Sequence, residues 1–280
     1  MTKDIYYFSG TGNSYAVARD ISQKIDGKLI SIGSLLNEKS IKIDSAIIGI
    51  IFPRYYGANH IGIPPVVKKF FLKLENIESK YIFVVCTFGG GVGDTFIKAD
   101  NLLKMRGGKL SAGYGVHMPQ NAFQKPWENK LKLFEKWDKK KEMICKNINS
   151  KSEIKFEKDP ISFKILQLIF KSFVNFQLIE KQNTAKSAHL SIDLSFENLM
   201  PFVDNGFCLD ENCNGCGICL KVCPVSNIKM IDNRPSWQHH CENCLACFNW
   251  CPEFSIHGGI VTKEYHYHHP TVKAKDLMKN

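Results

Sequence analysis

Short runs of apolar, β-forming residues alternate with longer stretches in which apolar side chains recur every three or four positions in the first half of the chain. The short runs occupy residues 5–8, 28–32, 45–52, 81–87 and 113–117. Helical patterns begin after residue 13 and recur near residues 65–74, 95–105 and 127–148. This alternation predicts an α/β domain over residues 1–150, with a doubly wound parallel sheet whose ligand binds at the carboxyl ends of the strands.

A different pattern follows in residues 151–200, which we interpret as an amphipathic helix and a linker. Residues 161–179 have an unusually wide apolar sector, and we expect this sector to dock between two domains. Binding to a membrane surface is the alternative, although the polar stripe holds only two lysines. Residues 183–197 are polar and rich in serine, which predicts a loop, and the composition changes again at Pro201.

A glycine- and hydroxyl-rich loop joins the first predicted strand to the first predicted helix. It consists of Ser9, Gly10, Thr11, Gly12, Asn13 and Ser14. Backbone N–H groups at a helix start, together with hydroxyl donors, favour a bound phosphate. The loop lacks the lysine of a P-loop, and Tyr15 stands where a dinucleotide motif has its third glycine. An ordinary glycine turn is the alternative for this loop taken alone.

Two more loops leave the carboxyl ends of predicted strands. The candidate ligand-binding residues in them are Pro53, Arg54, Tyr55, Tyr56 and Gly57, and Thr87, Phe88, Gly89, Gly90, Gly91 and Asp94. Glycine lets a backbone approach a flat ring, and a tyrosine can stack on it. At least one of the two tyrosines is expected to stack, unless one is buried and the other lies on the surface. Three interpretations of Arg54 remain open. Its side chain could pair with an external partner protein, neutralise charge on the bound ring, or simply be solvated.

Residues 1–150 resemble flavodoxin in this loop and in the succession of elements. The resemblance implies the strand order 2-1-3-4-5. It also implies FMN as the ligand, with hydroxyls and amides of residues 9–14 on the phosphate and the two later loops around the isoalloxazine ring.

A cysteine pattern occurs twice in the second half of the chain, with each member repeated after 28 residues. Its residues are Cys213, Cys216, Cys219 and Cys223, then Cys241, Cys244, Cys247 and Cys251, and proline follows the last cysteine of each set. The spacing C-x2-C-x2-C-x3-C-P predicts two [4Fe–4S] clusters with crossed ligation, in which Cys223 and Cys251 each bind the other loop's cluster. Zinc ribbons and disulfides are the alternatives, and the paired ligands of a zinc ribbon would leave the third cysteine of each loop and both Cys-Pro steps unexplained.

Residues 201–262 resemble the bacterial two-cluster ferredoxins, with short strands expected around Phe207, at 228–231 and at 259–262, and a turn at Asp232 and Asn233. The combination of the two domains resembles the clostridial-type flavodoxin–ferredoxin fusion proteins of the EFR1 family. The sequences at residues 7–14 and 212–219 look typical of that family. That resemblance implies electron carriage. Residues 263–280 are predicted to form a C-terminal tail.

Composition limits the cellular setting and the function classes. The chain has 280 residues, 44% of them hydrophobic, and 11 cysteines. The three cysteines outside the motifs, Cys86, Cys145 and Cys208, are too scattered for a disulfide framework, which predicts a reducing cytoplasm. We expect Cys208 to pack beneath a cluster. No signal-peptide pattern and no run of about 18 apolar residues occurs, so a soluble protein is expected.

Charge is distributed unevenly along the chain. Residues 1–150 carry 23 basic and 13 acidic side chains, whereas residues 201–260 carry 3 and 6. The two domains should therefore attract each other, and acidic redox proteins such as ferredoxins are the expected partners. Nucleic acid is disfavoured, because the lysines at 139–141 belong to the solvated face of a helix. The histidines near the second motif and in the tail are expected to have packing or surface roles.

The predicted function is electron transfer between FMN, two [4Fe–4S] clusters and external redox partners, converting between two-electron and one-electron carriers. The alternative is a flavin-dependent reductase of a quinone or another small molecule, fed by its own clusters. Its pocket would use Tyr55, Tyr56, Asn59, His60 and residues 88–94. No acid–base pair in the sequence points to a particular substrate.

Overall fold

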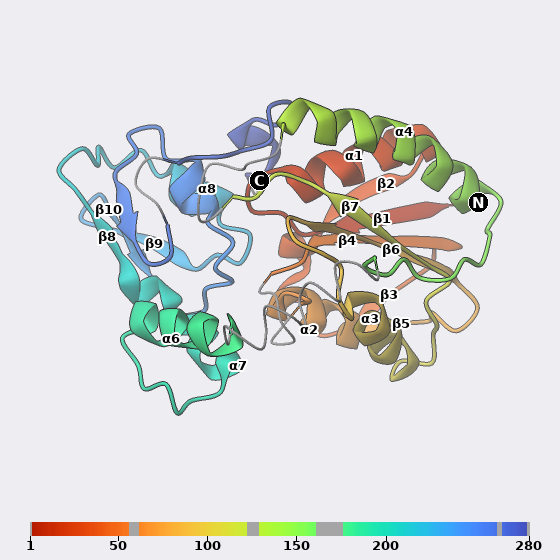
Figure 1. Ribbon diagram of the computed structural model, residues 1–280, viewed down its shortest axis with the longest axis horizontal. Helices are drawn as coiled ribbons and strands as arrows, with labels where there is room; N and C mark the ends of the chain where they lie inside the picture. The colour runs from red at the N-terminus through yellow and green to blue at the C-terminus, as the bar shows by residue number, and fades with distance from the viewer. Residues whose placement is uncertain (1, 56–61, 122–128, 161–175, 262–264, 279–280) are drawn as a thin grey trace.

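The computed structural model describes residues 2–55, 62–121, 129–160, 176–261 and 265–278 (Figure 1). A larger α/β part built around one sheet lies beside a smaller part formed by the C-terminal third of the chain. One buried apolar cluster extends through both parts and contains, for example, Phe70 of the first and Phe248 of the second. The two parts therefore share a core.

The large sheet is parallel throughout. Its strands are β1 (Lys3–Tyr7), β2 (Lys28–Ser31), β4 (Ile47–Pro53), β6 (Tyr81–Phe88) and β7 (Ala112–His117). Their order is β2-β1-β4-β6-β7, which is 2-1-3-4-5 when only these five strands are counted. The predicted flavodoxin-like α/β fold is thus confirmed. Two further short strands, β3 (Ile41–Lys42) and β5 (Leu74–Glu75), pair with each other.

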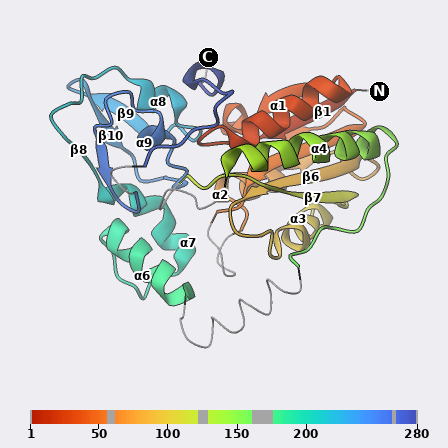
Figure 2. The same ribbon diagram turned by 45° about the horizontal axis from the view of Figure 1, so that its top comes forward.

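Helices cover both faces of the sheet (Figure 2). One layer contains α1 (Asn13–Ile25) and α4 (Lys130–Asn149), and the other contains α2 (Pro65–Lys73) and α3 (Thr95–Lys104). Strand β4 shows why both layers form. Its residues Ile47 and Ile51 belong to the core cluster on the α1 and α4 side, whereas Ile48 and Ile50 belong to the cluster on the other side. Successive side chains of a strand point to opposite faces, so a continuous apolar strand needs cover on both.

The C-terminal part has a near-twofold arrangement that follows the 28-residue repeat. Its elements are β8 (Phe207–Leu209), α8 (Ile218–Val222), β9 (Ile228–Ile231), β10 (Arg234–Trp237), α9 (Ala246–Asn249) and β11 (Ile256–Gly258). Strand β8 pairs with β11, and β9 pairs with β10. The strand predicted at 259–262 is misplaced, because Gly258 and Gly259 adopt left-handed backbone conformations that end β11. Strand β10 was not predicted, since its proline and arginine are poor strand signals.

The segment predicted as a linker is partly helical. Helix α6 (Phe176–Ala188) is followed by α7 (Phe196–Leu199) and the 3₁₀ segment η2 (Met200–Gly206). The hydroxyl of Ser187 donates to the carbonyl of Val203 at 3.2 Å, and the amide of Asn205 donates to the carbonyl of Ala188 at 2.8 Å. Packing on η2 thus stabilises a helix whose polar sequence predicted a loop. Most of the predicted helix at 161–179 lies outside the described residues.

Residues 265–278, called the strap below, are packed along the molecule. They contain the 3₁₀ segment η3 (Ala274–Asp276). The remaining 3₁₀ segment of the described residues, η1 (Ile32–Leu35), follows β2. The strap passes from the C-terminal part to the α1 side of the sheet (Figure 1). His266 and His268 stack on Phe248 and Trp250, with ring centroids 4.1 and 4.3 Å apart. These histidines therefore have the packing role that was expected of them.

Candidate functional site

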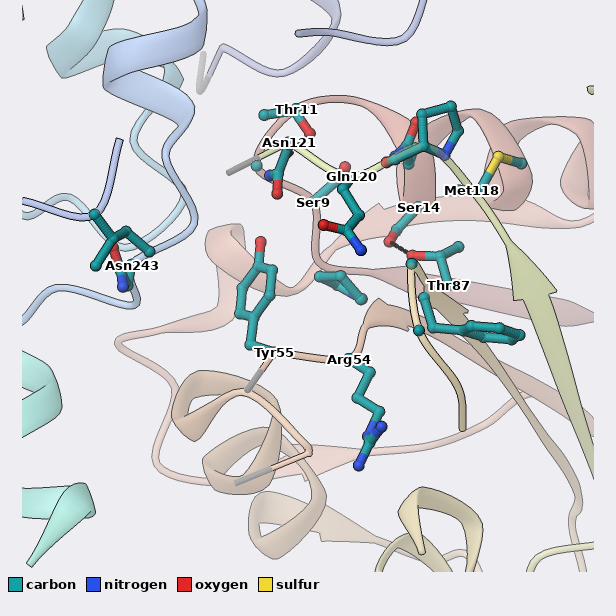
Figure 3. Close-up of a pocket in the computed structure, with 18 of the residues that line it drawn as sticks. Ser9, Thr11, Ser14, Arg54, Tyr55, Thr87, Met118, Gln120, Asn121 and Asn243 are labelled. Atoms are coloured by element: carbon teal, nitrogen blue, oxygen red, sulfur yellow. Dashed lines mark hydrogen bonds between the residues drawn. The ribbon is translucent and has the colours of Figure 1, made fainter. Parts of the chain in front are cut away.

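The loop between β1 and α1 forms a buried polar turn. Gly12 caps α1 with φ of 95°, and its N–H donates to the hydroxyl of Ser9 at 3.2 Å. The hydroxyls of Ser14 and Thr87 lie 2.8 Å apart and hydrogen-bond each other (Figure 3). Ser9, Thr11, Ser14 and Thr87 are all buried. The loop and the end of β6 therefore bring several neutral donors to one place at the start of a helix.

A cavity of about 600 Å³ opens at the carboxyl ends of the sheet strands. Its predicted lining residues are Ser9, Gly10, Thr11, Asn13, Ser14, Pro53, Arg54, Tyr55, Thr87, Phe88, Gly89, Gly90 and Gly91. Gly12 and Asp94 are absent from this lining. Asp94 instead forms an ion pair with Lys98 at 3.1 Å. Four residues of the predicted pockets, Tyr56, Gly57, Asn59 and His60, lie outside the described residues.

Four segments that line the cavity were not predicted. They contribute Met118, Pro119, Gln120 and Asn121 after β7, Asn183 and Thr184 of α6, and Asn243 and Ile260 of the C-terminal part. The loop after β7 could have been found, because it leaves the same edge of the sheet as the others. The remaining walls depend on how the C-terminal part packs. Figure 3 shows Asn243 approaching from that part, across from Ser14 and Thr87.

Arg54 and Tyr55 point in different directions from the end of β4 (Figure 3). The guanidinium of Arg54 donates to the carbonyl of Gly91 at 2.8 Å, so it holds the glycine-rich loop. Tyr55 is half-buried, and its ring meets that of Phe8 edge-on at 6.2 Å. On the other side of the glycine-rich loop, the carboxylate of Asp159 accepts from the N–H of Val92 at 2.7 Å.

These residues fit a phosphorylated flat ring. Buried hydroxyls gather at the helix start, and a side chain at Gly90 would meet no atom within 4 Å, so this backbone is open to a ring. Among the described lining residues the one basic side chain is Arg54, which already bonds to Gly91. A phosphate here would be held by neutral donors and the helix start. Asn13 uses its amide elsewhere, donating to the carbonyl of Pro119 at 2.9 Å and accepting from the hydroxyl of Tyr267 at 2.6 Å.

The eight motif cysteines gather in two groups. The outer set, defined here as Cys213, Cys216, Cys219 and Cys251, surrounds one small cavity in the C-terminal part. Cys216 is exposed and Cys213 and Cys251 are half-buried. Burial raises the pKa of the Cys219 thiol to about 11, and the other three sulfurs of the set also raise it. The structure therefore places Cys251 with the first loop.

The inner set is defined here as Cys223, Cys241, Cys244 and Cys247. Burial raises the pKa of Cys244 well above its usual value, and the next cause is the neighbouring sulfur of Cys223. Burial and then Cys223 also raise the pKa of Cys247, to about 12. Backbone N–H groups point at two sulfurs, from Asn227 to Cys223 and from Asn243 to Cys241, each at 3.2 Å. Such amide contacts tune the ligands of a metal cluster.

The arrangement of the sulfurs distinguishes between kinds of metal site. Among the described residues, no three His, Cys, Asp or Glu side chains converge on a site for one metal ion. A structural zinc ion needs such convergence, with sulfurs about 2.3 Å from the metal. A cubane cluster instead takes one thiolate at each iron, so its ligands surround a larger body. All eleven cysteines are free thiols. Each set brings four thiols together from the two cysteine loops, which is the number of thiolates that a cubane cluster takes.

The two cysteine loops share a backbone shape as well as a spacing. Gly215 and Gly217 have φ of 72° and 70°, and the residues 28 positions later, Asn243 and Leu245, have φ of 49° and 57°. Left-handed backbone at both places lets each loop wrap around one centre. Cys208 does not join either set. It is exposed on β8, so the prediction that it packs beneath a cluster is wrong, because alternation in the strand buries Phe207 and turns Cys208 outward.

Within the described part of the chain, none of the helices combines the length and the apolar character that a bilayer crossing demands.

Comparisons with known proteins match the α/β part of the chain. No family model and no curated protein sequence matches. Among solved structures, two-electron reduced flavodoxin from Megasphaera elsdenii has 19% identity and a TM-score of 0.33, covering 41% of this chain and 85% of that one. A Streptococcus pneumoniae TIGR4 flavodoxin has 15% identity and a TM-score of 0.35, with coverage of 53% and 100%. Oxidised flavodoxin 2 from Bacillus cereus has 20% identity and a TM-score of 0.33, with coverage of 52% and 99%.

Proposed function

We propose that this chain is an electron-transfer protein that binds FMN in the 600 Å³ cavity and a [4Fe–4S] cluster at each cysteine set. FMN exchanges one or two electrons and each cluster exchanges one, so the chain would convert between two-electron and one-electron carriers. The observation that carries the proposal is the shared wall of the two kinds of site. Asn243, which lies between two cysteines of the inner set, also lines the cavity.

The residues of the α/β part would bind and orient the flavin. Ser9, Thr11 and Ser14 supply hydroxyls near the start of α1, where the helix dipole favours a phosphate. Gly90 leaves its side of the cavity open to the ring, and Tyr55 lies at the opposite loop. Arg54 would act indirectly, by holding the carbonyl of Gly91 and therefore the glycine-rich loop.

The residues of the C-terminal part would hold the clusters and limit their contact with water. Cys223, Cys244 and Cys247 are buried, and the N–H groups of Asn227 and Asn243 point at sulfurs of the inner set. Hydrogen bonds to sulfur and solvent exposure are the levers by which a protein sets a cluster's potential. Because the outer set is more exposed, the two clusters should differ in potential.

The proposal also covers the cellular compartment of the protein and its redox partners. The three cysteines outside the two sets, Cys86, Cys145 and Cys208, form no disulfide, which supports a reducing compartment such as the cytoplasm. The basic excess of residues 1–150 supports acidic redox proteins, such as ferredoxins, as partners that approach the flavin part.

Anaerobic purification with metal, sulfide and flavin analysis tests the proposal. We expect about eight irons and one FMN per chain, since each [4Fe–4S] cluster holds four irons. Stoichiometric zinc, four irons or a different flavin would contradict it. Turnover assays then separate a carrier from a reductase. A carrier should reduce a separate ferredoxin or cytochrome faster than it reduces a quinone, and the opposite preference would establish the reductase alternative.

A further inference from the structure

We propose that the inner set holds the cluster that exchanges electrons directly with FMN, and that the outer set holds the cluster that serves external partners. This inference rests on the proposed function. It assigns an order to the redox centres: FMN, inner cluster, outer cluster, partner.

The phosphate loop and the inner cysteine loop are in direct contact. A Cβ atom placed on Gly10 would lie 2.9 Å from the Cβ atom of Cys244, closer than real Cβ atoms approach other atoms. Gly10 lines the FMN cavity, and Cys244 belongs to the inner set. Only the absence of a side chain at Gly10 lets the two backbones meet in this way.

Two polar side chains hold the contact together. The indole N–H of Trp250 donates to the carbonyl of Gly10 at 3.0 Å, and Trp250 is buried. The side-chain amide of Asn121 donates to the hydroxyl of Thr11 at 3.2 Å and lies 3.4 Å from the carbonyl of Cys244. Trp250 comes from the C-terminal part and Asn121 from the loop after β7, so each part of the molecule contributes one of these contacts.

The outer set faces away from this junction. Its cavity is lined by residues of β8, β9, β10 and β11, of the first cysteine loop and of the segment 251–255, and none of these residues also lines the FMN cavity. Cys216 of the outer set is exposed, whereas its repeat equivalent, Cys244, is buried against Gly10. The inner cluster thus has the shorter path to FMN, and the outer one has the shorter path to solvent.

Distance and burial together set the order of transfer. Electron tunnelling falls off exponentially with distance, so the cluster beside the cavity dominates exchange with the flavin. Reduction adds negative charge to a cluster, and such charge is costlier to bury at the inner set than at the outer set. FMN held in the cavity as its singly protonated hydroquinone would supply two electrons and one proton, and the two cysteine sets would each hold an acceptor for one of the electrons.

Trp250 is a positioning residue in this scheme. Its hydrogen bond to Gly10 fixes the phosphate loop against the inner cysteine loop and so sets the gap between the cofactors. Its ring also stacks on that of His268 in the strap, which restricts the indole to one orientation.

A matched pair of ligand variants tests the order. Cys216→Ser and Cys244→Ser change equivalent positions of the repeat, one in each set. Each holoprotein is analysed for iron and FMN, its flavin is photoreduced, and flavin absorbance is followed in stopped flow. With Cys216→Ser we expect four irons, an unchanged fast phase and half the parent amplitude, because one acceptor remains. With Cys244→Ser we expect the fast phase to disappear.

A second matched pair keeps the inference testable if a ligand variant loses both clusters. Trp250→Phe removes the hydrogen bond to Gly10, and Trp137→Phe removes an indole hydrogen bond of 2.9 Å to Asp20, in the α1 and α4 layer. We expect Trp250→Phe to slow the fast phase about fivefold, the factor that corresponds to one hydrogen bond of about 1 kcal/mol. Amide hydrogen exchange in residues 9–14 should rise in Trp250→Phe before FMN is added, and should stay at the parent level in Trp137→Phe.

The outcomes separate this inference from the proposed function. A parent protein without FMN, without eight irons, or without flavin-to-cluster transfer overturns the proposed function itself. If the parent transfers electrons but Cys216→Ser loses the fast phase while Cys244→Ser keeps it, the order is reversed. Equal effects within both pairs would show that neither cluster has privileged access to FMN, provided that each cysteine variant keeps FMN and four irons and each tryptophan variant keeps FMN and eight.

Discussion

Single backbone positions determine how tightly the cysteine loops turn. Gly217 and Leu245 occupy equivalent places of the repeat, and both are left-handed. This conformation costs a residue with a side chain about 1–2 kcal/mol. Leu245 is buried at 2% exposure in the shared core, so burial of its side chain offsets the strain. In one loop glycine therefore adopts this turn without strain, and in the other the burial of a leucine side chain offsets the strain.

We expect Gly217→Ala to destabilise the C-terminal part by about 1–2 kcal/mol through strain alone. A Cβ atom at Gly217 would meet no atom within 4 Å, so no clash contributes. The measurement is the guanidinium midpoint for loss of cluster absorbance in the anaerobic holoprotein. Ser34→Ala is the control, because Ser34 is exposed in η1 and its backbone is not left-handed. Equal midpoints for the two variants would contradict the strain argument.

The unit of β1, the loop and α1 shows how one element can prepare a binding site. The loop closes on itself through the bond from Gly12 to Ser9, and β6 supplies Thr87 to hold Ser14. Long-range contacts then fix Thr11 and Asn13 through Asn121 and Tyr267. The loop is thus positioned before any ligand binds, which lowers the entropy cost of binding.

The double variant Thr11→Ala with Ser14→Ala should weaken FMN binding about thirtyfold, because two hydrogen bonds of about 1 kcal/mol each would be lost. Fluorescence titration of the flavin-depleted protein measures the change. Iron content should remain at the parent value, since neither residue belongs to a cysteine set. Ser34→Ala serves as the control, because Ser34 is exposed in η1 and bonds only locally to Ser31. An unchanged FMN affinity in the double variant would mean that the phosphate binds elsewhere.

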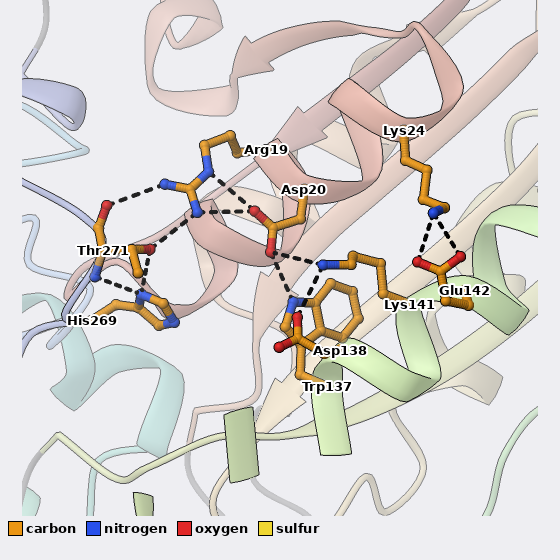
Figure 4. A network of polar contacts seen from close by, with 9 residues as sticks. All are labelled: Arg19, Asp20, Lys24, Trp137, Asp138, Lys141, Glu142, His269 and Thr271. Atoms are coloured by element: carbon orange, nitrogen blue, oxygen red, sulfur yellow. Dashed lines mark hydrogen bonds and ion pairs between the residues drawn. The ribbon is translucent and has the colours of Figure 1, made fainter. Parts of the chain in front are cut away.

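The strap ties the two parts of the molecule together. The backbone N–H of His269 donates to the carbonyl of Thr11 at 2.9 Å, and the side chain of Thr271 accepts from Arg19 at 3.0 Å (Figure 4). Val272 packs against Gly12, while residues earlier in the strap stack on α9 and its neighbours. The predicted tail is therefore part of the architecture that holds the phosphate loop against the cysteine loops.

Protonation of His269 should loosen this architecture. The pKa of His269 is lowered from 6.5 to about 4. Burial is the main cause, the positive charges of Arg19 and His268 also lower this pKa, and the carboxylate of Asp20 raises it. A buried imidazole with a depressed pKa stabilises the folded state fully above pH 6.5, where it is neutral, and this contribution to the free energy of unfolding is lost as the pH falls toward 4. We expect the loss to reach about 2 kcal/mol at pH 5.

The unfolding midpoint of the holoprotein at pH 7.5 and pH 5, compared between the parent and His269→Gln, measures this loss. The comparison cancels acid effects that both proteins share. The parent should lose more stability than the variant between the two pH values. An equal loss in both proteins would exclude His269 as the titrating group.

The amino-acid sequence by itself determined the features that depend on local order. Apolar runs of strand length alternate with helical patterns, and this periodicity predicts a parallel sheet with cover on both faces. The strand order followed from the resemblance to flavodoxin. The residues of the phosphate loop are contiguous, and the cysteines lie within two short repeats. Their candidate roles could therefore be predicted from residue type and spacing, and the resemblance to flavodoxin added FMN as the ligand.

Tertiary packing decided the rest. Asn121, Thr184 and Asn243 meet at one cavity although they are far apart in the chain. Arg54 bonds to Gly91, and Ser187 is helical because η2 covers it, although its polar surroundings predicted a loop. Contacts of this kind follow from how whole elements pack against one another. No period or motif encodes them, so the walls of the cavity, the strap and the junction at Gly10 emerge only in the folded molecule.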